Sequence, residues 1–196
     1  MCIRDRSTLA LALIGTILPD ASSGGDIYIG PVALSSVDKH VLRSRVSFVA
    51  QDPVLFAGTL RDNLDPQHDH SDDECSQLIA RVLTDPSPSG HAFTLATRVD
   101  GGGLNISQGQ RQLVGLGRAI LRRSAIVILD EATASIDPRT AAEIQHILRT
   151  ELKGTTVITI AHRADAVVGA DYVMHLSEKK LAGFTKIAQG ETALER

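Results

Sequence analysis

The sequence has few aromatic residues and only a small excess of acidic charge. Phe, Tyr and Trp together make up 3% of its 196 residues, and Trp is absent. Proteins that bind single-stranded nucleic acid stack bases on aromatic side chains, so this mode of binding is disfavoured. The net charge of -3 argues the same way, because binding to a phosphate backbone depends on Lys and Arg. We therefore expect no nucleic-acid partner.

Cysteine is also scarce. Cys2 and Cys75 are the two cysteines, and they lie far apart without the spacing of metal ligands. We expect two reduced thiols in a cytosolic protein.

Long apolar runs are missing as well. The longest, residues 9–18, is interrupted by Gly15 and Thr16 and is too short to span a bilayer. It also lacks the cleavage-site pattern of a signal peptide. Any membrane attachment is therefore expected from polypeptide outside this chain.

What is present is the pattern of a globular α/β domain, with 43% apolar and 22% charged residues. Strands alternating with helices predict a three-layer α/β fold with a largely parallel sheet. The expected helices cover residues 7–18, 71–83, 107–123 and 137–152, with a turn or short helix at 59–65. The expected strands cover residues 26–30, 45–50, 125–130, 155–161 and 171–176.

The most apolar strand, AIVILD at 125–130, ends in the carboxylate of Asp130 and is followed by that of Glu131. Such a run is typical of a strand buried on both faces, which places Asp130 and Glu131 at the ligand-binding carboxyl edge of the sheet. Asp130 could hold Mg²⁺, directly or through water, and Glu131 could polarise a water for attack on a phosphoryl group. Taken alone, two solvated acids are an equally good interpretation.

The segment NISQGQRQ at 105–112 adds a second element. Ser107 and Gln110 form a capping box, so a helix begins here. Its free backbone N–H groups, with Gly109 allowing close approach, make an anion site. A glycine-tolerant helix start explains the segment better in isolation, but its position before the Asp-Glu strand makes the pair more specific.

Two further polar residues follow predicted buried strands. The amide oxygen of Gln51 could reach Mg²⁺ or the attacking water, and His162 could hydrogen-bond a terminal phosphate. Each has a simpler alternative, a solvated strand end for Gln51 and a structural histidine for His162.

Five segments occur in order: VAQDPVLF, NISQGQRQ, AIVILDEAT, ASID and IAHR. Together they resemble the nucleotide-binding domain of an ABC transporter, over nearly the whole chain. The segment VAQDPVLFAGTLRDNLDP resembles subfamily C, the multidrug-resistance-associated type, and the intact Glu131 resembles that subfamily's second cassette.

The resemblance implies ATP and Mg²⁺ as cofactors and gives each motif a role. Glu131 would be the catalytic base, His162 the switch histidine, Gln51 the Q-loop residue and Asp130 the Walker B aspartate. Residues 105–110 would be the signature motif, here with Ser-Gln-Gly-Gln in place of Ser-Gly-Gly-Gln, and 134–137 the D-loop. Metal ligands would be Ser7, Gln51 and Asp130. Nucleotide contacts would come from Ser7, Thr8, Gln51, Ser107, Gln108, Gly109, Gln110, Asp130 and His162.

The first six residues, MCIRDR, depart from the family pattern. A phosphate-binding loop needs glycines and a Lys, but no glycine is present and Arg6 stands in place of the Lys. Asp5 would repel phosphate. The resemblance also implies upstream strands and an adenine-stacking aromatic that this chain does not contain.

We therefore expect residues 1–6 to be unrelated sequence left by truncation. Residues 7–178 are expected to form a partial ATP-binding domain, with a helical subdomain at about 59–115, and residues 179–196 a tail. This chain by itself is then expected to hydrolyse ATP negligibly.

The function implied is the ATP-hydrolysing module of a membrane exporter at the cytosolic face of a membrane. Its partners would be the exporter's transmembrane domains and a second nucleotide-binding domain of the same parent chain, in a head-to-tail dimer. Two alternatives remain. A soluble ABC ATPase is disfavoured by the exporter-type segment LFAGTLRDNLDP, and a non-hydrolytic dimerisation module by the intact Glu131 and His162.

In such a dimer each ATP lies between one cassette's phosphate loop and the other's signature helix. We therefore predict that Gln51, Asp130, Glu131 and His162 lie near Ser7 at one edge of the sheet. Ser107 should be exposed and more than roughly 10 Å from that cluster, because groups that share a phosphate lie within hydrogen-bond reach.

Overall fold

The computed structural model describes residues 3–17, 25–83, 92–131, 136–161, 169–177 and 180–187, with side chains from Ser7 onward. Its α-helices are α1 (Ile3–Leu13), α2 (Lys39–Arg45), α3 (Leu60–Leu64), α4 (Asp72–Val82), α5 (Gln108–Leu121) and α6 (Pro138–Thr150). Short 3₁₀ turns are η2 (Leu34–Ser36) and η3 (Gly101–Gly103). The strands are β1 (Tyr28–Ile29), β2 (Val32–Ala33), β3 (Val46–Val49), β4 (Gly58–Thr59), β5 (Arg98–Val99), β6 (Ile126–Asp130), β7 (Thr156–Ile160), β8 (Tyr172–Ser177) and β9 (Lys180–Lys186).

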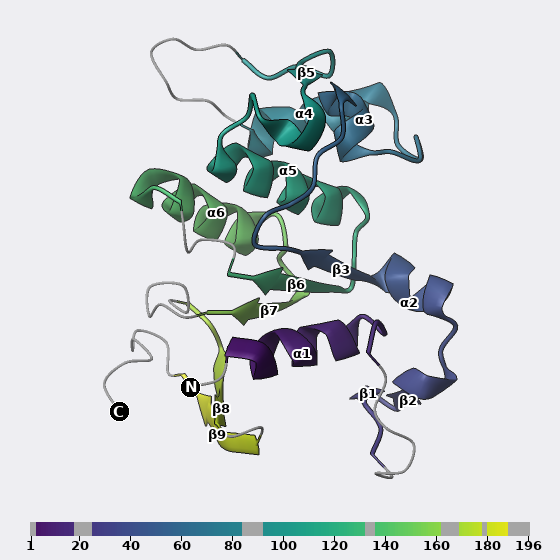
Figure 1. The fold of residues 1–196 in the computed structure, drawn as a ribbon, viewed down its shortest axis with the longest axis vertical. Helices are drawn as coiled ribbons and strands as arrows, with labels where there is room; N and C mark the ends of the chain where they lie inside the picture. The colour runs from purple at the N-terminus through teal and green to yellow at the C-terminus, as the bar shows by residue number, and fades with distance from the viewer. Residues whose placement is uncertain are drawn as a thin grey trace.

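A parallel sheet of order β3-β6-β7 forms the centre of the fold. α5 and α6 lie on one side of it and α1 on the other (Figure 1). These three layers agree with the predicted α/β architecture.

Alternate residues of the middle strand β6 enter two separate cores, as the period of two in a strand requires. Val127 and Leu129 pack on the side of α4, α5 and α6. Ile128 packs on the other side, with Ala10 of α1 and Ile160 of β7. Val127 and Ile128 have no exposed surface, so the prediction of a strand buried on both faces is confirmed for β6.

Helix starts follow the capping signals in the sequence. Ser71 and Ser107 are the N-caps of α4 and α5, and both make complete capping boxes. Asp137 caps α6, with Pro138 as its first residue. The turn or short helix expected at 59–65 is α3, which begins with a capping box between Thr59 and Asp62.

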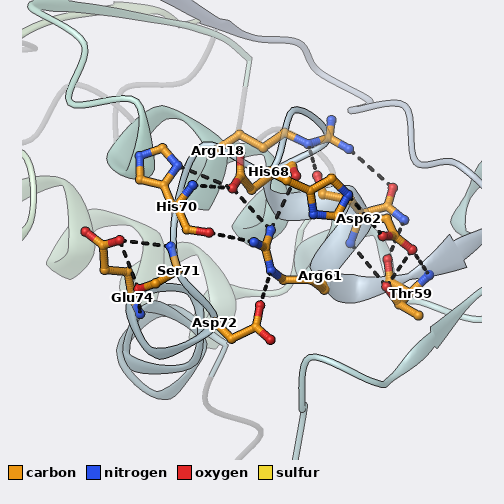
Figure 2. A network of polar contacts seen from close by, with 11 residues as sticks. Thr59, Arg61, Asp62, His68, His70, Ser71, Asp72, Glu74 and Arg118 are labelled. Atoms are coloured by element: carbon orange, nitrogen blue, oxygen red, sulfur yellow. Dashed lines mark hydrogen bonds and ion pairs between the residues drawn. The ribbon is translucent and has the colours of Figure 1, made fainter.

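A polar network holds α3 against the start of α4 (Figure 2). The Arg61 guanidinium donates to the carboxylates of Asp72, at 2.7 Å, and Asp65, at 3.1 Å, and to the backbone oxygen of His70 at 2.6 Å. Asp65 is almost fully buried, with a side chain 7% exposed. One arginine therefore ties together the segment between the two helices.

Several expected elements were wrong in extent or in place. α1 begins at Ile3, four residues before the predicted start, and ends at Leu13 instead of Leu18, because Gly15 takes a φ of +69° beyond the helix. Pro19, which follows the predicted helix and cannot continue it, lies outside the described residues. The strand expected at 26–30 is only β1, in a small hairpin with the unpredicted β2.

The prediction for residues 171–176 was wrong in sheet membership. β8 does not join the parallel sheet but pairs antiparallel with β9, a strand that was not predicted. Its Tyr172 stacks on Phe184 of β9 with ring centroids 5.3 Å apart, and both rings are exposed. β7 does join the parallel sheet, but as its last described strand it is only partly buried, apart from Ile160.

Candidate functional site

The carboxyl ends of three parallel strands meet at one edge of the sheet. Val49 of β3 pairs with Leu129 of β6, and Asp130 of β6 pairs with Ile160 of β7. The next residues along each strand direction are therefore Ala50, Glu131 and Ala161. Neighbouring strands lie about 4.8 Å apart, so side chains that leave these ends can share one small ligand.

Asp130 faces α1 because it has the same strand parity as Ile128. Ser7 lies on the same face of α1 as Ala10, three residues on, which packs in the core beneath β6. The Ser7 hydroxyl oxygen accordingly lies 3.5 Å from Asp130 Oδ2. Thr8, its neighbour, is exposed. The structure thus brings together two of the three predicted metal ligands.

Hydroxyl and carboxylate oxygens are ligands that suit Mg²⁺, which is bound through few protein groups together with waters and phosphates. The pair Ser7 and Asp130 therefore fits this ion. Among the described residues no group of three or more His, Cys, Asp and Glu side chains gathers as a metal cluster. The fit consequently rests on a hydroxyl and a single carboxylate.

Glu131 turns the chain sharply at the end of β6. Its φ is +48°, and its backbone N–H donates to the Ile160 oxygen across the sheet edge at 3.1 Å. A left-handed backbone is unusual for a residue with a long side chain and is often found at functional sites.

Gln51 lies in an exposed loop directly after β3, and its backbone is held from α5. Gln112 Nε2 donates to the oxygens of Ala50, at 3.1 Å, and Gln51. Arg111 Nε donates to Asp52 Oδ1 at 3.1 Å. Gln51 and Asp52 thus belong to a loop that is held by two side chains of α5.

Ser107 is exposed, as predicted, and its side chain accepts from the Gln110 N–H at 3.2 Å. Gly109 is buried, and a Cβ there would lie 2.6 Å from Thr140 Cγ2 of α6. Glycine at 109 is therefore required for packing against α6, in addition to the predicted access for an anion. Gln108 and Gln110 are partly exposed beside it.

Sequence reasoning missed the contacts of Arg111 and Gln112. A signal was available for Gln112, because it shares a helical face with buried Gly109, Leu113 and Leu116. An amide on such a face needs a partner, and the loop carbonyls supply it. His162 and residues 132–135 lie outside the described residues.

The family model for ABC transporters matches residues 6–134. The chain belongs to the ABC transporter family. It is 45% identical over 179 residues to ABC transporter C family member 5 of Arabidopsis thaliana, covering 91% of this chain and 12% of that protein. It is 43% identical over 163 residues to ATP-binding cassette sub-family C member 2 of Rattus norvegicus, covering 83% and 11%. These names agree with the C-type resemblance of the segment that begins at Val49.

A solved structure of a bacterial Atm1-family ABC exporter with ATP bound matches the fold with a TM-score of 0.80 and 28% identity. The match covers 93% of this chain and 32% of that one. The chain thus spans a small part of the relatives it matches, and it corresponds to an ATP-binding module of a transporter. No helix among its described residues is both long enough and apolar enough to cross a membrane.

Proposed function

We propose that this chain supplies the hydrolytic half-site of an ABC exporter, in which water attacks the terminal phosphoryl group of ATP. The observation that carries the proposal is the contact between Ser7 and Asp130, beside Glu131 at the carboxyl edge of the parallel sheet. Mg²⁺, when bound, would neutralise phosphate charge and orient the terminal phosphate.

Each protein group has a distinct part in this proposal. Ser7, Asp130 and the Gln51 amide oxygen hold the metal, directly or through water. The Glu131 carboxylate accepts a proton from the attacking water. His162 hydrogen-bonds the terminal phosphate.

The second half of each site would come from a partner. Ser107 is exposed at the N-terminus of α5, where backbone N–H groups favour an anion. In a head-to-tail pair with a second nucleotide-binding domain of the same parent chain, this terminus would contact the partner's ATP, together with Gln108, Gly109 and Gln110. Transmembrane domains of the parent protein would place the module at the cytosolic face of a membrane.

The chain by itself should hydrolyse ATP negligibly, because residues 1–6 supply neither the glycines nor the lysine of a phosphate loop. Phosphate release from purified chain with Mg²⁺ and ATP should equal that of a Glu131→Gln control. Turnover above this control would contradict the assignment of residues 1–6.

Placing a Gly-rich loop ending in Gly-Lys, and the upstream strands, before Ser7 should create activity. In that protein Glu131→Gln should keep ATP affinity while kcat falls by about 10²-fold or more, because only the proton acceptor is lost. Equal kcat values would remove Glu131 from the base role.

His162→Ala in the same protein should also lower kcat, and an unchanged kcat would make His162 a structural histidine.

A further inference from the structure

The loop carrying Gln51 is positioned by a side chain that belongs to another element. Gln112 of α5 is 2% exposed, and its amide nitrogen donates to the backbone oxygens of both Ala50 and Gln51. Because a single amide group joins two successive carbonyls, it fixes the direction in which the chain leaves β3. The side chain of Gln51 itself is free to face solvent or ligand.

Arg111 joins the same loop to the segment that leads into α5. Its guanidinium contacts Asp52 Oδ1 at 3.1 Å, the Ile106 oxygen at 2.9 Å and the Gly103 oxygen at 3.4 Å. Ile106 immediately precedes Ser107. The ion pair therefore connects the residue after Gln51 with the residue before the predicted anion site.

Close backbone packing strengthens this connection. A Cβ at Gly115 would lie 3.0 Å from Pro53 Cγ and 3.2 Å from Val49 Cγ1. The glycine thus lets α5 approach the end of β3 and the loop more closely than a larger residue would. Tight packing of this kind transmits displacement instead of absorbing it.

We propose that Gln112 is a positioning residue for Gln51, and that with Arg111 it makes the Gln51 loop and the Ser107 end of α5 move as one unit. Ser107 and Gln112 are five residues apart, about 7.5 Å along a helix. The second half of this inference rests on the proposed function, in which Gln51 faces the chain's own ATP and Ser107 faces the partner's. Occupation of one site then shifts the geometry of the other, and the coupling is reciprocal.

The positioning role is tested on the chain as it stands by hydrogen exchange. Gln112→Met keeps the side-chain length, removes both donated hydrogen bonds and removes the Oε1 atom that has no hydrogen-bond partner. Peptides covering residues 50–56 should exchange about tenfold faster, since two hydrogen bonds of modest strength are lost. Gln77→Met, the same change on the exposed face of α4, is the matched control. Equal exchange in the two variants would overturn the proposal.

The link between Gln112 and the nucleotide site is tested in the full-length parent protein by a double-mutant cycle. If Gln112 acts through Gln51, then Gln112→Met and Gln51→Ala should each lower kcat, and the double variant should be no slower than Gln51→Ala alone. The Mg²⁺ dependence of ATP binding, measured in a Glu131→Gln background, should shift equally in all three. If the reductions in kcat of the two single variants multiply in the double variant, the link between Gln112 and Gln51 is overturned.

Turnover and hydrogen exchange together distinguish an error in the proposed function from an error in the positioning role of Gln112. If the proposed function is wrong, the full-length protein without substitutions has no Mg²⁺-dependent turnover, while the hydrogen-exchange result still stands. If the positioning role is wrong, that protein turns over ATP normally and Gln112→Met behaves like Gln77→Met in both measurements.

Discussion

The backbone of Glu131 has a φ of +48°, a conformation that costs a residue with a side chain about 1–2 kcal/mol. The hydrogen bond from its N–H to Ile160 and the two neighbouring strands hold it there. If the carboxylate is the proton acceptor, this strain is tolerated because it directs the group that the reaction needs.

Glu131→Gly should therefore be more stable than Glu131→Ala by about 1 kcal/mol, since both lack the carboxylate and only glycine accepts the left-handed backbone freely. Urea unfolding of the two variants measures the difference. The same pair at Glu143, inside α6, should show the opposite order, because glycine weakens a helix interior. Ala more stable than Gly at 131 would show that the turn is not strained.

The residues at the carboxyl edge of the parallel sheet show which parts of a site can be predicted from sequence. Asp130 ends a strand whose apolar residues require burial, so its place could be predicted from the pattern. The approach of Ser7 was predicted only through the family resemblance, because contacts between residues 123 apart have no local signal. The burial of Gln112 had a signal in its helical face, but its partners did not, because they are backbone carbonyls, which every residue has.

At the scale of elements, α5 and α6 cross at a glycine. Gly109 lies in the first turn of α5, against Thr140 in the first turn of α6. The capping box at Ser107 and the Asp137 N-cap before Pro138 predicted the two starts from local sequence, but no local pattern specifies how close the two helices come. That distance depends on the absence of a side chain at Gly109.

Gly109→Ala should destabilise the protein by about 1–3 kcal/mol, because its Cβ would lie 2.6 Å from Thr140 Cγ2 and the β-branched threonine rotates with difficulty in a helix. Adding Thr140→Ser, which removes that methyl group, should restore more than half of the loss. Gly101→Ala, where a Cβ meets nothing within 4 Å, is the control and should be nearly neutral in thermal unfolding. A loss that Thr140→Ser leaves unchanged would exclude this contact as the cause.

At the scale of the whole molecule, stability depends on a buried carboxylate outside the proposed site. Burial raises the pKa of Asp65, but polar contacts from the His70 and Asp69 backbone and from the side chains of His70 and Arg61 outweigh it, so the pKa is lowered. The folded state therefore holds this proton less tightly than the unfolded chain does. Asp65 consequently stabilises the fold above the ordinary carboxyl pKa of about 3.9 and ceases to do so as the pH falls through its lowered value.

Asp65→Asn should thus lower the free energy of unfolding by about 1–3 kcal/mol at pH 7, through loss of charged hydrogen bonds, and by less near pH 3. Urea midpoints at the two pH values give the comparison. Asp73→Asn, the same substitution at an exposed position in α4, is the matched control measured at both pH values. A deficit for Asp65→Asn that is as large at pH 3 as at pH 7 would contradict the assignment.

The overall architecture could be predicted because β3, β6 and α5 have apolar patterns that match their periods. The hairpin of β8 and β9 could not, since its residues alternate weakly and a short apolar run does not state which sheet it joins. The early start of α1 was missed for a different reason. Residues 3–6 contain no helix breaker, but the predicted helix began at Ser7, where the family resemblance begins.

The pairing of β3 with β6 has a consequence for how the protein is made. Val46 and its partner Ile126 are separated by the whole segment that holds α3, α4 and α5. At about 5–20 residues per second, a ribosome exposes β3 roughly 4–16 seconds before β6 exists. During that interval β3 lacks β6, the strand beside it in the described parallel sheet, while the helices after it can already pack locally. Slow translation through this segment would prolong the exposure, and chaperone binding to nascent chains should peak before residue 126 emerges.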